Sequence, residues 1–166
     1  MIDIDRLIRH LRLEPLPIEG GYFRQTWVAD EKVSIARYPS PRPAGTAIYY
    51  LLTSDADSFS ALHRLATDEI YHFYLGDPVE MLLLSDGGPA HRIILGPDLL
   101  RGQHVQYVVP RYVWQGSRLL AGGKFALMGT TMAPGFDPGD FTLGRRDELL
   151  RLHPGHADLI RGLTRA

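Results

Sequence analysis

The sequence predicts a mainly β fold, an antiparallel sandwich or barrel with a short helix at each end. Many short segments alternate apolar and polar residues or are apolar throughout, which is typical of strands. Turn residues separate these segments at a steady, short spacing. No amphipathic helix lies between them, so the crossover helices of a parallel sheet are missing. A length of 166 residues suits one domain, and we expect residues 1–166 to form it.

A helix is expected at the start of the chain. Four apolar residues recur at the spacing of one helix face: Ile4, Leu7, Ile8 and Leu11. Asp3 or Asp5 can cap its first turn, and Pro15 ends it. A second helical pattern covers residues 145–163 and is broken at Pro154.

From Gly20 onward the apolar period changes to two. The stretch 30–45 contains three prolines and is expected to be a surface loop. The expected strands are 22–29, 46–53, 58–65, 69–76, 79–85, 90–96, 104–110, 113–120 and 124–132. The separators between them are rich in Gly, Pro and Asp, which are the residues of tight turns.

Composition excludes several classes of function. The chain has no cysteine, which rules out disulfides, thiolate metal sites and cysteine nucleophiles. Lys and Arg number 18 against 19 Asp and Glu, so no net charge favours nucleic acid or an anionic membrane. No apolar run approaches the roughly 20 residues of a membrane helix, and the start lacks the apolar core of a signal peptide. We therefore expect a cytoplasmic protein with no nucleic-acid or membrane partner.

The densest group of polar residues is His63, Asp68, Glu69 and His72. If segments 58–65 and 69–76 form a hairpin, His63 and Glu69 point into one interior and His72 points to the opposite face. An imidazole beside a carboxylate suits metal ligation or general acid–base chemistry. The alternative is a buried pair in which the two groups only satisfy each other.

The whole chain resembles the cupin family catalogued as a domain of unknown function, DUF985 (cupin type 5). The segments that match its pattern in order are 19–27 (EGGYFRQTW), 46–53, 59–84, 95–110, 113–115 and 133–141. This resemblance implies a double-stranded β-helix, the cupin jelly roll, with short N- and C-terminal helices.

The resemblance also bears on metal binding. It places His63 and Glu69 at metal-ligand positions of cupins, whereas Leu65 and Gln115 occupy positions of two further metal-binding histidines. The loss of two imidazoles removes strong nitrogen donors, so we expect no tightly held transition metal. The three residues His63, Glu69 and Gln115 could still hold a weakly bound divalent metal.

Metal-free cupin sugar-nucleotide epimerases use a histidine base and a tyrosine acid. By resemblance, the protein is expected to be a metal-independent isomerase or epimerase acting on a sugar-like substrate, with His63 as base. Glu69 would orient His63, and the acid would be one of Tyr22, Tyr71 and Tyr112, among which the sequence does not choose; Tyr22 is the first candidate. The expected substrate-binding residues are Arg24, Tyr49, Tyr71, His72, Trp114 and Gln115.

Two other functions stay open, so the sequence does not decide whether the protein is an enzyme. One is a metal-dependent cupin enzyme with a reduced ligand set, and the other is a non-catalytic module that binds or stores a small molecule. A homodimer is expected in each case. Exposed sheet edges and an outer face carrying Ile70, His72 and Tyr74 need to be covered.

Overall fold

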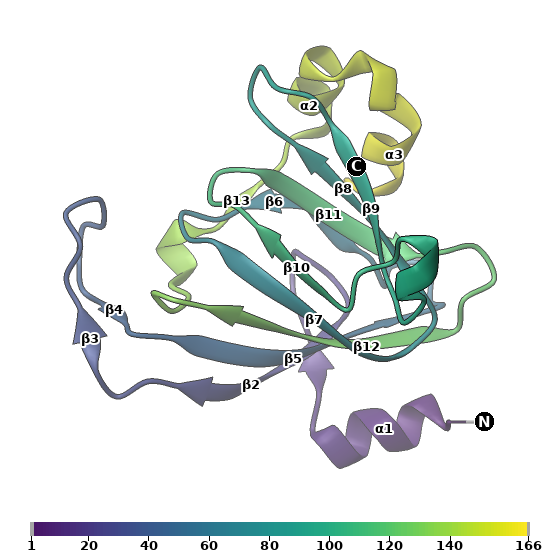
Figure 1. The fold of residues 1–166 in the computed structure, drawn as a ribbon, viewed down its shortest axis with the longest axis horizontal. Helices are drawn as coiled ribbons and strands as arrows, with labels where there is room; N and C mark the ends of the chain where they lie inside the picture. The colour runs from purple at the N-terminus through teal and green to yellow at the C-terminus, as the bar shows by residue number, and fades with distance from the viewer. Residues whose placement is uncertain (1, 166) are drawn as a thin grey trace.

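Two antiparallel β-sheets face each other in the computed structural model, which describes residues 2–165 (Figure 1). The larger sheet contains, in spatial order, β1 (Glu14–Pro15), β2 (Tyr22–Val28), β5 (Thr46–Thr53), β12 (Phe125–Met132), β7 (Glu69–Gly76) and β10 (Gln106–Val109). The smaller sheet contains β13 (Thr142–Leu143), β6 (Ser60–Arg64), β11 (Trp114–Leu119), β8 (Val79–Leu84) and β9 (His91–Leu95). These two facing sheets confirm the predicted mainly β jelly roll.

The predicted strands agree closely with the observed ones. Strands β5 and β7 coincide with the expected segments 46–53 and 69–76, and the other expected segments each contain a slightly shorter strand. The expected loop 30–45 contains a small hairpin of β3 (Lys32–Val33) and β4 (Arg42–Pro43), which projects from one end of the molecule (Figure 1). Short 3-10 turns occur at η1 (Leu99–Arg101), η2 (Pro138–Asp140) and η3 (Pro154–His156).

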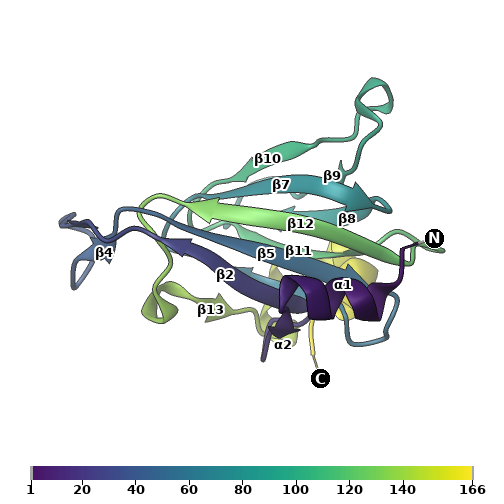
Figure 2. The same cartoon turned by 90° about the horizontal axis from the view of Figure 1, so that it is seen from below.

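The N-terminal helix α1 (Ile4–Leu11) covers part of the outer face of the larger sheet (Figure 2). Its cap is Asp3, whose side chain accepts a hydrogen bond of 3.0 Å from the backbone N–H of Arg6. The four predicted apolar residues of the helix pack against Leu13, Leu51 and Leu127. Leu75 of β7 takes part in this contact, whereas Ile70 and Tyr74 of the same strand do not.

The C-terminal helices α2 (Arg146–Leu152) and α3 (Ala157–Gly162) pack on the outer face of the smaller sheet (Figure 1). Pro154 separates them, as the sequence predicts. Their buried contacts are Leu149, Ile160 and Leu163, which meet Leu62, Leu82, Leu84 and Trp114 of the sheet. Within residues 2–165, no helix has the length and apolar character needed to cross a membrane.

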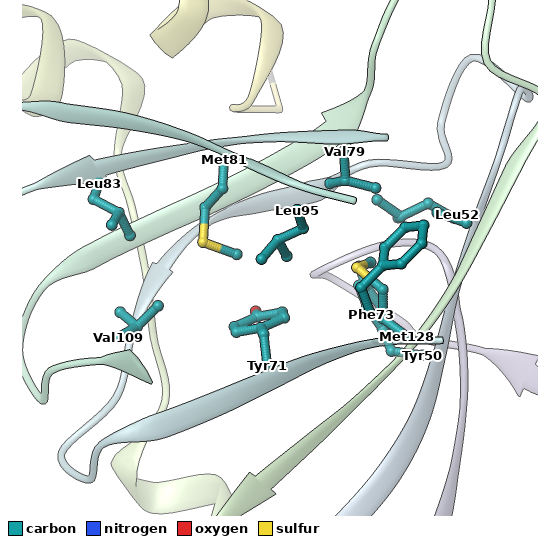
Figure 3. Close-up of a cluster of buried hydrophobic side chains, with 11 residues drawn as sticks. Tyr50, Leu52, Tyr71, Phe73, Val79, Met81, Leu83, Leu95, Val109 and Met128 are labelled. Atoms are coloured by element: carbon teal, nitrogen blue, oxygen red, sulfur yellow. The ribbon is translucent and has the colours of Figure 1, made fainter. Parts of the chain in front are cut away.

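An apolar cluster fills one part of the space between the two sheets (Figure 3). Its buried members include Tyr50, Leu52, Tyr71, Phe73, Val79, Met81, Leu83, Leu95, Val109 and Met128. Burial of each large apolar side chain stabilises the fold by about 1.5–3 kcal/mol before conformational entropy is counted. This cluster therefore closes the sandwich at one end and leaves room for a cavity at the other.

The predicted hairpin between β6 and β7 is wrong. Strand β6 pairs with β11 and β13, whereas β7 pairs with β12 and β10 in the opposite sheet. The segment 65–68 therefore crosses from one sheet to the other. His63 and Glu69 still point into one interior, because each is on the inward face of its own sheet.

Candidate functional site

A cavity of about 620 Å³ lies between the sheets, a volume suited to a small-molecule ligand. Its polar side chains include Glu19, His63, Glu69 and Thr130. Its apolar wall includes Leu16, Phe23, Ile48, Met132, Phe136 and Phe141. Strands of both sheets position three of the polar groups, with His63 on β6, Glu69 on β7 and Thr130 on β12, whereas Glu19 lies in the turn before β2.

His63 is held in one orientation at the cavity wall, with only 1% of its surface exposed. Its Nδ1 lies 2.8 Å from the carbonyl oxygen of Ala61, and because a carbonyl can only accept, Nδ1 carries a hydrogen. The ring also stacks on Phe141, with centroids 5.1 Å apart. In the neutral imidazole Nε2 then has the free lone pair, and it makes no hydrogen bond within residues 2–165.

Glu69 is buried beside His63 and Gln115. The side-chain Nε2 of Gln115 donates a hydrogen bond of 2.8 Å to Oε2 of Glu69. Gln115 reaches this point because it is the register partner of His63 in the pairing of β11 with β6. Burial raises the pKa of Glu69 above its ordinary value, although the charge of His63 and hydrogen bonds from Thr130 and Gln115 act in the opposite direction. The carboxyl therefore keeps its proton to a higher pH than an exposed glutamate does.

Sequence reasoning missed a second cavity carboxylate, Glu19. Its Oε1 accepts a hydrogen bond of 2.8 Å from the hydroxyl of Ser60, and its backbone oxygen accepts one of 2.8 Å from Ala61. The next residue, Gly20, has φ of 107°, and a Cβ there would lie 2.3 Å from the carbonyl oxygen of Phe59. The Glu-Gly-Gly turn of the sequence was the available signal, but nothing in its spacing indicates a contact with Ser60.

The structure places two of the expected aromatic site residues outside the cavity. Tyr22 and Tyr49 lie on the outer face of the larger sheet, in the cluster beneath α1. The expected acid Tyr22 is therefore on the opposite side of the sheet from His63, because alternation along β2 turns Phe23 inward instead. Arg24 borders the cavity, but its guanidinium lies over the ring of Tyr49, 5.4 Å from the ring centroid.

The remaining expected residues divide between core and surface. Tyr71 is buried in the apolar cluster, where burial and the charge of Glu69 raise its pKa well above its ordinary value. His72 faces outward, as predicted, and Nε2 lies 3.2 Å from the hydroxyl of Thr131. Trp114 packs under the C-terminal helices, since it is adjacent to the inward-facing Gln115 in β11. Tyr112 is half exposed at the surface.

A buried ion pair holds the segment that forms the mouth of the cavity. The guanidinium of Arg42 donates two hydrogen bonds, of 2.9 and 2.8 Å, to the carboxylate of Asp140. Residues 136–141 between β12 and β13 contribute Phe136, Pro138 and Phe141 to the cavity wall. The pair therefore fixes this segment against β4. It thereby also holds the ring of Phe141, which stacks on His63.

The family of the chain follows from its sequence as well as from this geometry. Residues 5–144 match the sequence model of the family described as "Cupin superfamily (DUF985)". The protein belongs to this family.

Several relatives resemble the chain over most of its length. The uncharacterized protein YML079W of Saccharomyces cerevisiae is 30% identical over 147 residues, which are 81% of this chain and 72% of the yeast protein. A hypothetical protein from Leishmania major has a TM-score of 0.90 and 29% identity, covering 99% of this chain and 100% of that one. Protein SO0799 from Shewanella oneidensis has a TM-score of 0.86 and 32% identity, covering 99% of each chain.

More distant structures share the fold alone. A dTDP sugar isomerase from Desulfovibrio desulfuricans has a TM-score of 0.52 and 18% identity, covering 80% of this chain and 88% of that one. An oxalate decarboxylase from Bacillus subtilis, whose Mn(II) centres have been described, has a TM-score of 0.52 and 12% identity over 91% of this chain and 37% of the other. Shared fold at such identities leaves activity to be argued from the site.

The side chains at the cavity do not fit a transition metal. In the part of the chain that the structure describes, no group of three or more His, Asp or Glu side chains is arranged to hold one. His63 offers one nitrogen, and the raised pKa of Glu69 means that a proton competes for its carboxylate. Gln115 directs its Nε2 to Glu69, and its buried Oε1 has no hydrogen-bond partner among residues 2–165. This donor set is weak for the metals that cupins hold through three imidazoles.

Proposed function

We propose that the protein is a metal-independent isomerase or epimerase that moves a proton at a carbon next to a carbonyl group. The observation that carries this proposal is the fixed imidazole of His63, whose Nε2 borders the cavity beside a carboxyl group of raised pKa. Such a reaction needs a base with a free lone pair and an acid that holds its proton, and His63 and Glu69 are the groups in this cavity that can supply them.

In the proposed reaction, Nε2 of His63 takes a proton from the carbon beside the carbonyl. The electron pair of the broken C–H bond moves toward the carbonyl oxygen and forms an enol or enolate. The protonated carboxyl of Glu69 donates a hydrogen bond to that oxygen and stabilises the developing charge. If the deprotonated carbon carries a hydroxyl, His63 returns the proton to the former carbonyl carbon while the hydroxyl gives its proton to Glu69 and Glu69 gives its own to the former carbonyl oxygen, which yields the carbonyl isomer. If instead water delivers a proton to the opposite face of the original carbon and His63 releases its proton to water, the product is the epimer.

This scheme differs from the tyrosine acid expected from the sequence. Tyr22 lies across the sheet and Tyr112 at the surface, so the acid in the proposed reaction is Glu69. Tyr71 approaches Glu69 from the apolar cluster and forms a hydrogen bond with it. In the proposed reaction Tyr71 positions the carboxyl group of Glu69 and does not contact the substrate.

A second candidate function is ligand binding without turnover. The observation that favours it is the Gln115–Glu69 hydrogen bond, which satisfies one carboxyl oxygen without any substrate. A binding module would need only the shape and polarity of the cavity, and its ligand would leave unchanged.

The test measures proton exchange, so it does not require the natural substrate. A panel of small ketoses, aldoses and other hydroxy-carbonyl compounds is incubated with the protein in D₂O, and deuterium incorporation is followed by NMR. His63→Asn is expected to lower the exchange rate by roughly two to four orders of magnitude, the usual contribution of a general base. His72→Asn, a matched change on the outer face, should leave the rate unchanged.

Unchanged exchange in the His63→Asn variant would contradict the proposed base. Exchange absent from the wild type across the whole panel, together with tight binding of one of its members, would favour the binding module. A large fall in melting temperature of His63→Asn would support a structural role for the His63–Glu69 pair.

A further inference from the structure

We propose that Glu19 selects the ligand of this cavity. The ligand presents a hydrogen-bond donor, either a hydroxyl or an ammonium group, to the inner end of the cavity, where Glu19 and His63 lie, and it places no anionic group there. The inference names the substrate class of the proposed enzyme and thus rests on the same cavity. It argues against a phosphate-bearing substrate at the position of His63.

Glu19 is fixed with one carboxylate oxygen available. Oε1 is occupied by the hydroxyl of Ser60, and the backbone of Glu19 is held by Ala61 and by the side chain of Arg165. Oε2 makes no hydrogen bond or ion pair within residues 2–165. A rigid carboxylate oxygen bordering a cavity is a ready acceptor for a ligand's O–H or N–H group.

An independent observation points to a ligand at the same place. His63 lines the cavity, and only 1% of its surface is exposed. Its Nδ1 is paired with the carbonyl oxygen of Ala61, and its Nε2 has no hydrogen-bond partner among residues 2–165. Buried polar groups in proteins are almost always hydrogen-bonded, so an unpaired acceptor at a cavity wall is suited to a ligand donor. Glu19 and His63 therefore each offer an acceptor to a hydrogen-bond donor of the ligand.

The charges around the cavity point in the same direction. Glu19 is acidic and Glu14 adds a second carboxylate at the exposed rim, whereas Glu69 offers no positive charge in either protonation state. Arg24 is the single Lys or Arg among the lining residues in 2–165, and its guanidinium lies over Tyr49 instead of facing His63. Arg165 reaches the outer side of the turn and donates to backbone carbonyls there. A phosphate or carboxylate at the inner end would face like charges with no cation to pair it.

The apolar wall defines the other half of the ligand. Phe23, Ile48, Phe136 and Phe141 line the cavity together with the polar end. A ligand with a compact apolar or ring-shaped body and a donor group at one end matches both halves.

Three probes of nearly equal shape test this proposal: benzyl alcohol, benzylamine and benzoate. Each has the same phenyl ring, and they differ in presenting a hydroxyl, an ammonium or a carboxylate group. Dissociation constants are measured by NMR titration of the His63 and Phe141 ring signals. We expect the alcohol and the amine to bind, and benzoate to bind at least about tenfold more weakly, because like charges oppose it.

Glu19→Gln keeps the size and one acceptor oxygen of the side chain but removes its charge. This variant should reduce the preference for benzylamine over benzoate by about tenfold. Glu14→Gln, the same change at the exposed rim, is the matched control and should change that preference far less than Glu19→Gln does, because water and salt screen an exposed charge. Melting temperatures of both variants verify that they are folded.

Equal or tighter binding of benzoate by the wild type would overturn the proposal, and so would binding of none of the three probes. An unchanged preference in folded Glu19→Gln would overturn the role of Glu19. If the probes bind in the expected order while no carbonyl compound exchanges deuterium, the proposed enzymatic function fails and this inference stands.

Discussion

The two ends of the space between the sheets share strands β5, β7 and β12 but have opposite properties. At the closed end, buried apolar side chains such as Phe73 and Leu95 pack together (Figure 3). At the open end, Glu69 from the same strand as Phe73 borders a cavity with His63 opposite. Four residues along β7 thus separate a packed core from a cavity wall that carries titratable groups. The closed end holds the sheets together, which allows the open end to keep unpaired acceptors.

The largest expected effect comes from breaking the closed end. Leu95 is fully buried, and Leu95→Ala should lower the free energy of unfolding by about 2–5 kcal/mol through lost contacts and a new void. Leu65→Ala, the same truncation at the cavity wall, should cost clearly less because that side chain already borders empty space. Urea denaturation measures both values. Equal losses would show that the two ends do not differ in packing.

A smaller effect is expected from the charge at the open end. Because burial raises the pKa of Glu69, the folded state holds its proton more tightly than the unfolded chain does. The free energy of unfolding therefore falls as the pH rises from the ordinary pKa of a glutamate through the raised pKa of Glu69 in the folded state. Glu69→Gln removes this loss. The free energy of unfolding of the variant minus that of the wild type should therefore be more positive at about pH 8 than at about pH 4. Denaturation series at the two pH values test this, and an identical difference at both would contradict it.

The smallest effect on stability is expected on the outer face of β7 and β10, which touches neither end. We propose that Ile70, Tyr74 and Val108 form the interface of a homodimer, since Val108 is 49% exposed and β10 is an edge strand of the sheet. Val108→Lys should give a monomer by light scattering at micromolar concentration with little change in melting temperature. Leu152→Lys, a similar change on α2, is the control. A wild-type protein that is itself monomeric would refute the interface.

Local patterns in the sequence predicted the elements well, and non-local contacts explain what they missed. The helix around Ile4–Leu11 and the strands 46–53 and 69–76 depend on periodicity within each segment. The hairpin was wrong because the partners of β6 and β7 are far away in the sequence. Period two alone also cannot say which face is inward, so Tyr22 was expected in the cavity where Phe23 lies.

The candidate site shows the same division. His63, Glu69 and Gln115 were found from the family motif; His63 and Glu69 line the cavity, and Gln115 lies behind Glu69 and donates a hydrogen bond to it. Trp114 and Gln115 are neighbours in one strand, so alternation allowed only one of them to face inward. Glu19 escaped notice because its contact with Ser60 joins residues 41 positions apart.

The ion pair between Arg42 and Asp140 has a consequence for how this family can diversify. Replacing Arg42 alone would leave the buried carboxylate of Asp140 without this ion pair, and replacing Asp140 alone would leave Arg42 with only the longer contact of 3.6 Å to Asp137, so the pair acts as a fixed frame. Within that frame, Phe136 and Pro138 line the cavity and carry no part of the anchor. Evolution, or an engineer, can therefore change the cavity wall at these two positions while the ring of Phe141 keeps its place on His63. The shape of the cavity wall and the setting of the His63 ring can thus vary independently of each other.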